Sequence, residues 1–271
     1  MLDKVLEIPQ EIIKSRRLVW SLAKNDFKSR FAGSYLGIVW ALVQPIVTVL
    51  VYWFVFQVGL RQTATYGDNC PFVLWMLAGL VPWFYFQETM LTGCGVLSEY
   101  SYLVKKVVFK IEILPAVKIL SSLFIHLFFV GIALLLFLIY GKLSPAYAWQ
   151  VFYYTFCMMA LVLGISYATS AVNVFFRDLM QIINIAMQVG VWVTPIMWNM
   201  ADLNLPRALT VILKLNPMYY ICYGYRDALV YKVNFWERPE LTIYFWVFTL
   251  LCFLIGTNVF KRLRVHFADI L

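Results

Sequence analysis

Few residues of this sequence could carry out catalysis. Its two histidines, His126 and His266, occur without an HExxH or GxSxG pattern, so neither a zinc nor a serine hydrolase is indicated. No GxxxxGK[ST] motif is present, and the chain therefore lacks this phosphate-binding loop of ATPases. The five cysteines form no CxxC pair, which argues against a zinc site and a disulfide framework. We expect no catalytic residue, no metal site and no cofactor in this chain.

Two charged residues lie inside apolar runs, where ionisable side chains usually have a function. For Glu88 we expect an interhelical hydrogen bond or a subunit contact, with substrate contact as the alternative. Lys118 is close enough to the end of its run to extend its ammonium group to the membrane surface. An ion-coupled carrier would normally contain more buried acids, so this scarcity argues against that class.

Aromatic residues form 18% of the chain, and many gather near the predicted outer face. An interfacial belt accounts for most of them, yet aromatic rings also stack on sugar rings. A glycan contact or a gate is therefore an alternative function for this group. The predicted channel or outer-gate residues are Trp83, Tyr85, Glu88, Tyr219, Tyr220, Tyr223 and Arg226.

The composition identifies the elements that position these residues. Hydrophobic residues make up 63% of the chain, charged residues 13%, and the mean hydropathy is +0.78, which predicts an all-α polytopic membrane protein. No second folded domain is expected. Six spans are predicted, at Leu36–Val58, Phe72–Val96, Ile113–Tyr140, Ala148–Phe176, Met180–Asn199 and Leu241–Phe260.

The stretch between the fifth and sixth predicted spans is apolar and aromatic but is interrupted by charges and by Pro217. A proline at this position would break a continuous helix. We therefore predict two short re-entrant or interfacial helices over Pro206–Tyr231.

Most of the 22 Lys and Arg residues fall on one side of the predicted spans. By the positive-inside rule, this side is cytoplasmic and holds both termini. The net charge of +8 then reflects attraction to anionic membrane lipids and requires no nucleic-acid partner. No removable signal peptide is evident, so the first span is expected to direct the chain to the membrane.

The segment Glu11–Phe31 has the pattern of an amphipathic interfacial helix. One side carries Val19, Leu22, Ala23, Phe27 and Phe31, and another carries Arg17, Lys24 and Lys28. A simple basic anchor on the inner leaflet explains the pattern equally well. The predicted division is a cytoplasmic N-terminal region at 1–34 and a six-helix transmembrane region at 35–271.

Six stretches are more specific, namely "KNDFKSRFAGSYLGIVWALVQPIVTVLVYWFVF", "LAGLVPWFYFQET", "LVKKVVFKIEILP", "NVFFRDL", "LNPMYYICYGYRDAL" and "FKRLRVHFADIL". In this order and spacing they resemble the permease subunit of type-2 ABC exporters for bacterial polysaccharides. This family includes the O-antigen, capsule and wall teichoic acid exporters. The resemblance runs from about residue 15 to the end of the chain.

The resemblance implies a homodimeric channel with two copies of a separate ABC subunit that binds ATP and Mg. It also implies transport of a lipid-linked glycan, carried on undecaprenyl diphosphate, out of the cytoplasm across the bacterial cytoplasmic membrane. The segment Lys14–Phe31 corresponds to the interface helix of the family, and Glu99–Ile111 to its coupling helix. Lys110 stands where this coupling segment often has a proline, which leaves the end of the helix open.

Two sets of site residues follow from the resemblance. The expected contacts with the ATPase are Glu99, Tyr102, Lys105, Lys106, Arg177 and Asp178. The substrate entrance is predicted where the interface helix joins the first span, because cations there could attract a diphosphate and glycines allow a sharp turn. Its residues are Lys28, Arg30, Gly33, Tyr35 and Gly37.

Two other classes remain open. An ion-coupled glycan-lipid flippase would need no ATPase partner. A type-2 ABC permease for drugs or small lipids would differ in its cargo alone.

Overall fold

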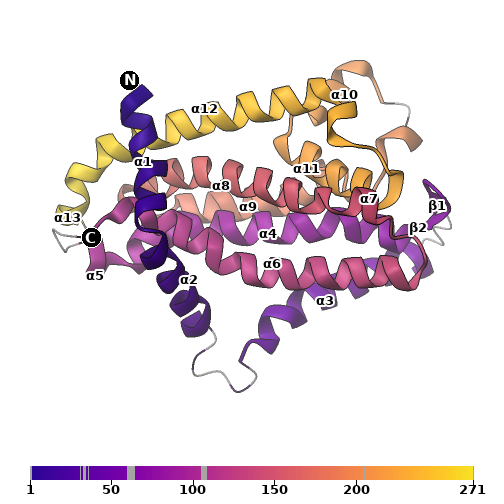
Figure 1. Cartoon of the computed structure of the whole chain (residues 1–271), viewed down its shortest axis with the longest axis horizontal. Coiled ribbons are helices and arrows are strands. Elements are labelled where there is room, and N and C mark those ends of the chain that lie inside the picture. The colour runs from indigo at the N-terminus through magenta and orange to yellow at the C-terminus, as the bar shows by residue number, and fades with distance from the viewer. Residues whose placement is uncertain are drawn as a thin grey trace.

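The computed structural model describes residues 2–30, 32, 35, 37–59, 65–104, 109–203 and 205–270, with side chains except those of 2–7, 268 and 269. Its long helices run side by side along one axis (Figure 1). In chain order the elements are α1 (Leu2–Lys14), α2 (Arg16–Arg30), α3 (Val39–Trp53), η1 (Phe54–Gly59), β1 (Thr65–Tyr66), β2 (Cys70–Pro71), α4 (Phe72–Glu99), α5 (Ser101–Val104), η2 (Ile111–Ile113), α6 (Leu114–Ile139), α7 (Pro145–Ala148), α8 (Gln150–Phe175), α9 (Leu179–Val193), η3 (Met200–Asp202), α10 (Arg207–Lys214), α11 (Pro217–Arg226), η4 (Asp227–Tyr231), η5 (Phe235–Glu237), α12 (Pro239–Leu263), η6 (Arg264–His266) and α13 (Phe267–Ile270).

Four helical stretches in the described part of the chain are long and apolar enough to cross a membrane. They are Val39–Gly59, Ile111–Ile139, Pro145–Phe175 and Pro239–His266. The two other predicted spans are occupied by α4 and by α9, which has only 15 residues. The helical membrane fold predicted from the sequence is therefore confirmed, and the count of six spans stays a prediction.

The centre of the bundle is α4, which is buried along most of its length against α6, α8 and α11. Beside it, α8 and α12 pack closely because two glycines face each other. A Cβ atom added to Gly256 would lie only 2.1 Å from the carbonyl oxygen of Gly164. Small residues of this kind let membrane helices approach each other at the backbone.

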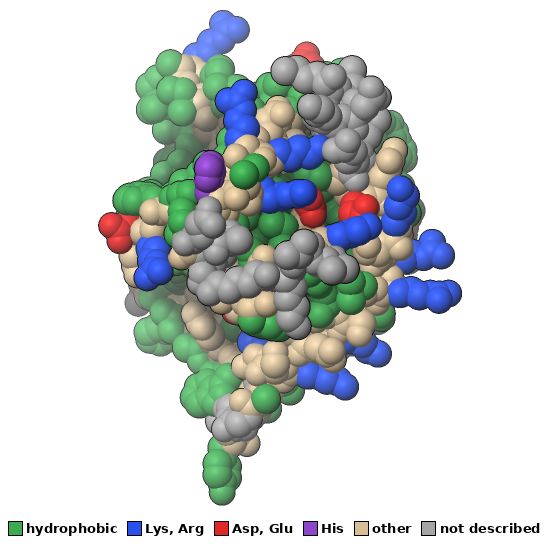
Figure 2. All heavy atoms as spheres, turned by 90° about the vertical axis from the view of Figure 1, so that its left-hand side faces the viewer, with side chains coloured by type: hydrophobic (Ala, Val, Ile, Leu, Met, Phe, Trp, Pro, Cys, Tyr) green, Lys and Arg blue, Asp and Glu red, His purple; other side chains and the backbone are tan. Residues whose placement is uncertain are grey.

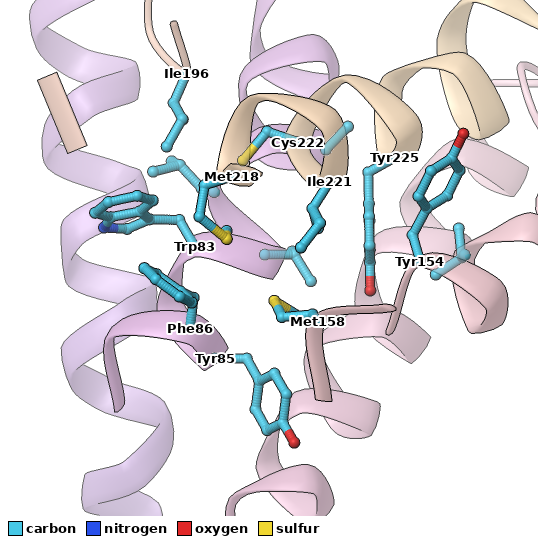
Figure 3. Close-up of a cluster of buried hydrophobic side chains, with 14 of the residues drawn as sticks. Trp83, Tyr85, Phe86, Tyr154, Met158, Ile196, Met218, Ile221, Cys222 and Tyr225 are labelled. Carbon is cyan, nitrogen blue, oxygen red and sulfur yellow. The ribbon is translucent and has the colours of Figure 1, made fainter. Parts of the chain in front are cut away.

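Two short helices, α10 and α11, occupy the segment predicted to be re-entrant. α11 lies inside the bundle, where Met218, Ile221, Cys222 and Tyr225 pack between α4 and α8 (Figure 3). Asn216 caps α11 by accepting a 3.0 Å hydrogen bond from the backbone of Met218, and Pro217 follows at the first helical position. The placement of these helices relative to a membrane stays a prediction.

The two ends of the bundle differ in charge. One end, here called the basic end, consists of α1, α2, α5, α13 and the turn between α8 and α9. Figure 2 looks onto this end and shows many Lys and Arg side chains gathered there. The opposite end, the hairpin end, consists of the β1–β2 hairpin, α7, η3 and α10 (Figure 1). The antiparallel hairpin pairs Thr65 with Pro71 and Tyr66 with Cys70.

The N-terminal segment forms two helices rather than one, because the chain turns at Ser15 between α1 and α2. In α2 the predicted faces are present: Val19 and Ala23 are buried, whereas Arg17, Lys24 and Lys28 are exposed. α2 packs on α6. α3 contrasts with it, since none of its residues is buried within this chain.

Candidate functional site: a polar and aromatic groove

A groove of about 640 Å³ lies between four helices at the depth of the apolar spans. Its walls come from α3, α4, α6 and α9, and the end of α2 closes one side. The residues that line it are Arg30, Trp40, Ala41, Gln44, Pro45, Thr48, Tyr52, Val81, Trp83, Phe84, Tyr85, Gln87, Glu88, Leu91, Ile125, His126, Phe129, Met187, Gln188, Val191 and Trp192. The volume is in the range of ordinary ligand pockets.

Aromatic rings set the shape of the groove. The Trp83 ring lies against the backbone of α9 at Gly190, where an added Cβ would come within 2.8 Å of the ring. Tyr52 of α3 and Trp192 of α9 form an edge-to-face pair with ring centroids 6.2 Å apart. Tyr85 stacks on His126 at 4.6 Å and donates a hydrogen bond to the carbonyl oxygen of Ile119. These contacts fix α3, α4, α6 and α9 around the opening.

Three glutamines supply amide groups to the same groove. Gln44 comes from α3, Gln87 from α4 and Gln188 from α9. Within the described residues, none of the three side-chain amides has a hydrogen-bond partner. An amide can both donate and accept hydrogen bonds, so these side chains can bind a polar ligand in the groove.

The charged residues that line the groove pair with each other. Arg30, at the end of α2, forms an ion pair with Glu88 of α4, and the Ser122 hydroxyl donates a 3.0 Å hydrogen bond to the same carboxylate. This is the interhelical hydrogen bond expected for Glu88. No further Lys, Arg, Asp or Glu occurs among the described lining residues.

A second polar cluster lies beside the groove at the basic end. The Lys118 ammonium donates hydrogen bonds of 2.6 Å to both Asp26 and Glu99, and the Tyr100 hydroxyl donates one of 2.7 Å to Asp26. Lys118 is only 3% exposed, so the expectation that it extends to the membrane surface is wrong. Its ammonium group bonds instead to Asp26 of α2, which packs directly against α6.

Asp26 is held in its ionised form by these partners. Burial raises the pKa of its carboxyl, but the hydrogen bonds from Lys118 and Tyr100 lower it, and the pKa ends below its ordinary value. The cluster therefore keeps a charged pair inside the protein, which fixes the position of α2 on the bundle.

The predicted channel or gate residues separate into three groups, of which two line cavities. Trp83, Tyr85 and Glu88 line the groove, near the middle of α4 rather than near the predicted outer face. Tyr219 and Tyr223 stack on each other at 4.4 Å and line a different cavity of about 540 Å³ at the hairpin end. The structure does not bring these two groups together.

Tyr220 and Arg226, also predicted at the gate, are packed inside the protein. The Tyr220 hydroxyl lies 3.0 Å from that of Thr242, and Arg226 is 0% exposed. Arg226 donates hydrogen bonds to the carbonyl oxygens of Trp75, Pro195 and Ile196, and its guanidinium lies 3.4 Å above the Trp75 ring. In this arrangement Arg226 holds the chain after α9 against α4.

The predicted entrance residues lie at the connection from α2 to α3. Lys28 is exposed, and so is Tyr35. Gly37 has a φ of +53°, a conformation that favours glycine, and this permits the sharp turn expected there. No described atom lies within 4 Å of an added Cβ, so a close backbone approach is absent among the described residues. Gly33 lies outside the described residues. Of the entrance set, Arg30 alone lines the groove in the described structure.

Several predicted ATPase contacts lie at the basic end. All four described members, Glu99, Tyr102, Arg177 and Asp178, are exposed, and the Glu99 carboxylate also bonds to Lys118. Lys105 and Lys106 lie outside the described residues. Within the predicted coupling segment Glu99–Ile111, α5 covers Ser101–Val104, and Lys110 is extended, with φ −85° and ψ 92°, so the helix does not continue through Lys110; the coupling role stays a prediction. Lys110 instead pairs with Glu11 of α1.

Sequence reasoning missed two parts of the site. Asp26 lies four residues before Arg30 on the apolar side of α2, and an acid at that spacing was a usable signal. The three glutamines gave no such signal, because they come from helices far apart in the chain.

The comparison with known proteins identifies the class of this helical membrane protein. Residues 17–230 match the family described as ABC-2 type transporter. The chain belongs to the ABC-2 type transporter family. Three relatives of this ABC-2 chain are named O-antigen export system permease protein RfbA. The one from Myxococcus xanthus is 27% identical over 98% of this chain and 99% of its own length, and two from Klebsiella pneumoniae are 23% and 24% identical over 92% of this chain and 93% of theirs.

Membership of the ABC-2 family indicates the kind of protein in which the groove lies. An ABC-2 transporter chain is a multi-pass membrane subunit and is not itself the ATPase. Its matched region includes all the described groove residues, from Arg30 to Trp192.

Proposed function

We propose that this ABC-2 permease is the membrane channel subunit of an ATP-driven polysaccharide exporter. It moves a lipid-linked glycan, carried on undecaprenyl diphosphate, from the cytoplasmic to the outer side of the bacterial cytoplasmic membrane. It works as a homodimer with two copies of an ABC subunit that binds ATP and Mg, and both of its termini are cytoplasmic. The observation that carries this proposal is the similarity to O-antigen export permeases over nearly the whole length of both chains.

The groove supports the proposal. It combines aromatic rings with polar amides at membrane depth, and transporter selectivity depends on such lining groups. Within the part of the chain that the structure describes, no ion-coupling acid is free in this groove, because Glu88 pairs with Arg30. This favours an ATP-driven subunit over an ion-coupled flippase.

We assign the basic end to the ATPase. Tyr102, Arg177 and Asp178 are exposed there, and the cluster of Asp26, Lys118, Glu99 and Tyr100 joins α2 to the end of α4 just before α5. A displacement of α5 would therefore reach α2 through these buried bonds. The entrance is proposed at the turn from α2 to α3, where the exposed Lys28 can attract a diphosphate headgroup.

Depletion of this chain tests the proposal. We expect lipid-linked glycan to accumulate on the cytoplasmic side of the membrane and surface polysaccharide to disappear, and we expect the chain to copurify with an ATPase. Normal surface polysaccharide after depletion would contradict the proposal. Glycan movement in vesicles that contain only this chain, driven by a proton gradient, would instead identify an ion-coupled flippase. Accumulation of a drug or small lipid would identify the third class.

A further inference from the structure

We propose that the groove between α3, α4, α6 and α9 binds uncharged sugar residues and selects against glycans that carry phosphate in every repeat. This inference rests on the proposed function and adds to it the chemical class of the transported chain.

The first step concerns charge. The groove has one cation and one anion among its described lining residues, and Arg30 and Glu88 neutralise each other. A phosphate inside the groove would have to draw Arg30 away from Glu88, which would leave a carboxylate without its partner. Any other phosphate along the groove would have no cation to pair with, and an unpaired buried charge is strongly unfavourable.

The second step concerns the neutral polar groups. The amides of Gln44, Gln87 and Gln188 come from three different helices and have no partner within the described residues. A sugar ring offers hydroxyl groups that both donate and accept hydrogen bonds, as an amide does. Amides therefore match an uncharged sugar without adding charge to the groove.

The third step concerns the aromatic rings. Trp40, Trp83 and Trp192 come from the same three helices as the glutamines. Trp40 and Trp192 are 54% and 52% exposed, so their rings are accessible to a ligand. Indole rings pack against the flat C–H face of a sugar, which is apolar although its edge is polar. Trp83 is only 3% exposed and its ring packs on Gly190, so accessible rings lie beside an amide on two walls, with Trp40 and Gln44 on α3 and Trp192 and Gln188 on α9.

Binding to the full chain in lipid nanodiscs tests this inference. The probes are maltohexaose, which is uncharged, and a glycerol phosphate hexamer of similar length. Quenching of Trp fluorescence reports binding, because three Trp side chains line the groove. We expect the wild type to bind maltohexaose at least about tenfold more tightly than the phosphate hexamer.

A single substitution should weaken this preference. Gln188→Lys places a cation in the groove at an exposed position, so we expect the ratio of hexamer affinity to maltohexaose affinity to rise about tenfold. Gln181→Lys is the matched control, since Gln181 is exposed on the same helix two turns away and does not line the groove. Glu88→Gln removes one of the two carboxylates that pair with Arg30, the other being Asp26, and should shift the ratio in the same direction as Gln188→Lys.

The inference is overturned if the wild type binds the phosphate hexamer as tightly as maltohexaose, or if neither probe binds. Equal effects of Gln188→Lys and Gln181→Lys would also overturn it. These outcomes leave the proposed export function standing if depletion still abolishes surface polysaccharide. Conversely, the wild type could bind maltohexaose selectively while cells depleted of the chain still export polysaccharide normally. That result would contradict the proposed export function and support the sugar-binding role of the groove.

Discussion

Lys118 of α6 and Asp26 of α2 form an ion pair with a 2.6 Å separation, and both side chains are almost completely buried. Glu99, at the end of α4, bonds to the same ammonium group. One lysine therefore joins α2 to the segment that leads into α5.

Lys118→Met should destabilise the protein by about 3 kcal/mol or more, because it removes the nearest cation from the charged and buried Asp26 and leaves it only the more distant Arg30 at 3.5 Å. The unfolding temperature of the detergent-solubilised protein is the measurement. Lys110→Met is the matched control, since Lys110 is 56% exposed and its pair with Glu11 contributes about 1 kcal/mol or less. If the unfolding temperature falls equally in the two variants, the buried pair stabilises the protein no more than the exposed pair does.

Acid should weaken the same pair. The pKa of Asp26 in the folded protein is below its ordinary value of 3.8, so the stabilisation is complete above pH 3.8 and is lost as the pH falls through the lowered pKa. We expect the difference in unfolding temperature between wild type and Asp26→Asn to be constant from pH 7 to pH 5 and to narrow below pH 3.8. A difference that grows in acid would contradict this assignment.

An acidic side chain introduced at the basic end should weaken the complex with the ATPase. Arg177→Glu and Tyr102→Glu each change an exposed side chain, and we expect at least about a tenfold loss of affinity in pull-down titrations. Arg207→Glu, at the hairpin end, serves as the control because it is exposed and far from this surface. Lys105→Glu and Lys106→Glu should act as Arg177→Glu does. Unchanged affinity in all four variants would contradict the assignment of this surface to the ATPase.

Gly256→Val should separate α12 from α8. Its Cβ would collide with the backbone of Gly164, which cannot move aside as a flexible side chain can, and we expect a loss of about 3 kcal/mol. Gly131→Val in α6 is the control, because no described atom lies within 4 Å of its Cβ and its effect should stay within about 1 kcal/mol. Unfolding temperatures of the two variants measure the difference.

Gly37→Val should impair export through the turn between α2 and α3. Valine at a φ of +53° is strained by about 1 to 2 kcal/mol, whereas Gly37→Asn accepts this conformation and should restore function. Surface polysaccharide and protein abundance are measured together in cells. If the valine variant exports normally, the turn does not contribute to the entrance. Gly33→Val and Arg30→Ala should reduce export while the protein remains bound to its ATPase.

The long helices were predictable because their signal is local. Apolar runs located α3, α4, α6, α8, α9 and α12, and the periodic pattern located the buried face of α2 at Val19 and Ala23. The number of spans was less certain for a physical reason: α9 has only 15 residues, about 22 Å of helix against roughly 30 Å of hydrocarbon.

The site was only partly predictable because its residues come from distant segments. Glu88 was recognisable as a charge at membrane depth, but its partner Arg30 lies 58 positions away. Lys118 was expected to extend to the membrane surface, as a lysine near a helix end usually does. It instead forms an ion pair with Asp26 inside the protein. Arg226 was assigned to the gate because its carbonyl partners leave no pattern in the sequence.

Arg226 also has a consequence for biosynthesis. Its N–H groups are satisfied by backbone carbonyls of α4 and of the chain just after α9, and all of these are translated before α11. An arginine without such partners is expensive to place in a bilayer. We therefore expect α11 to enter its position late, after the segments that carry its carbonyl partners are in the membrane.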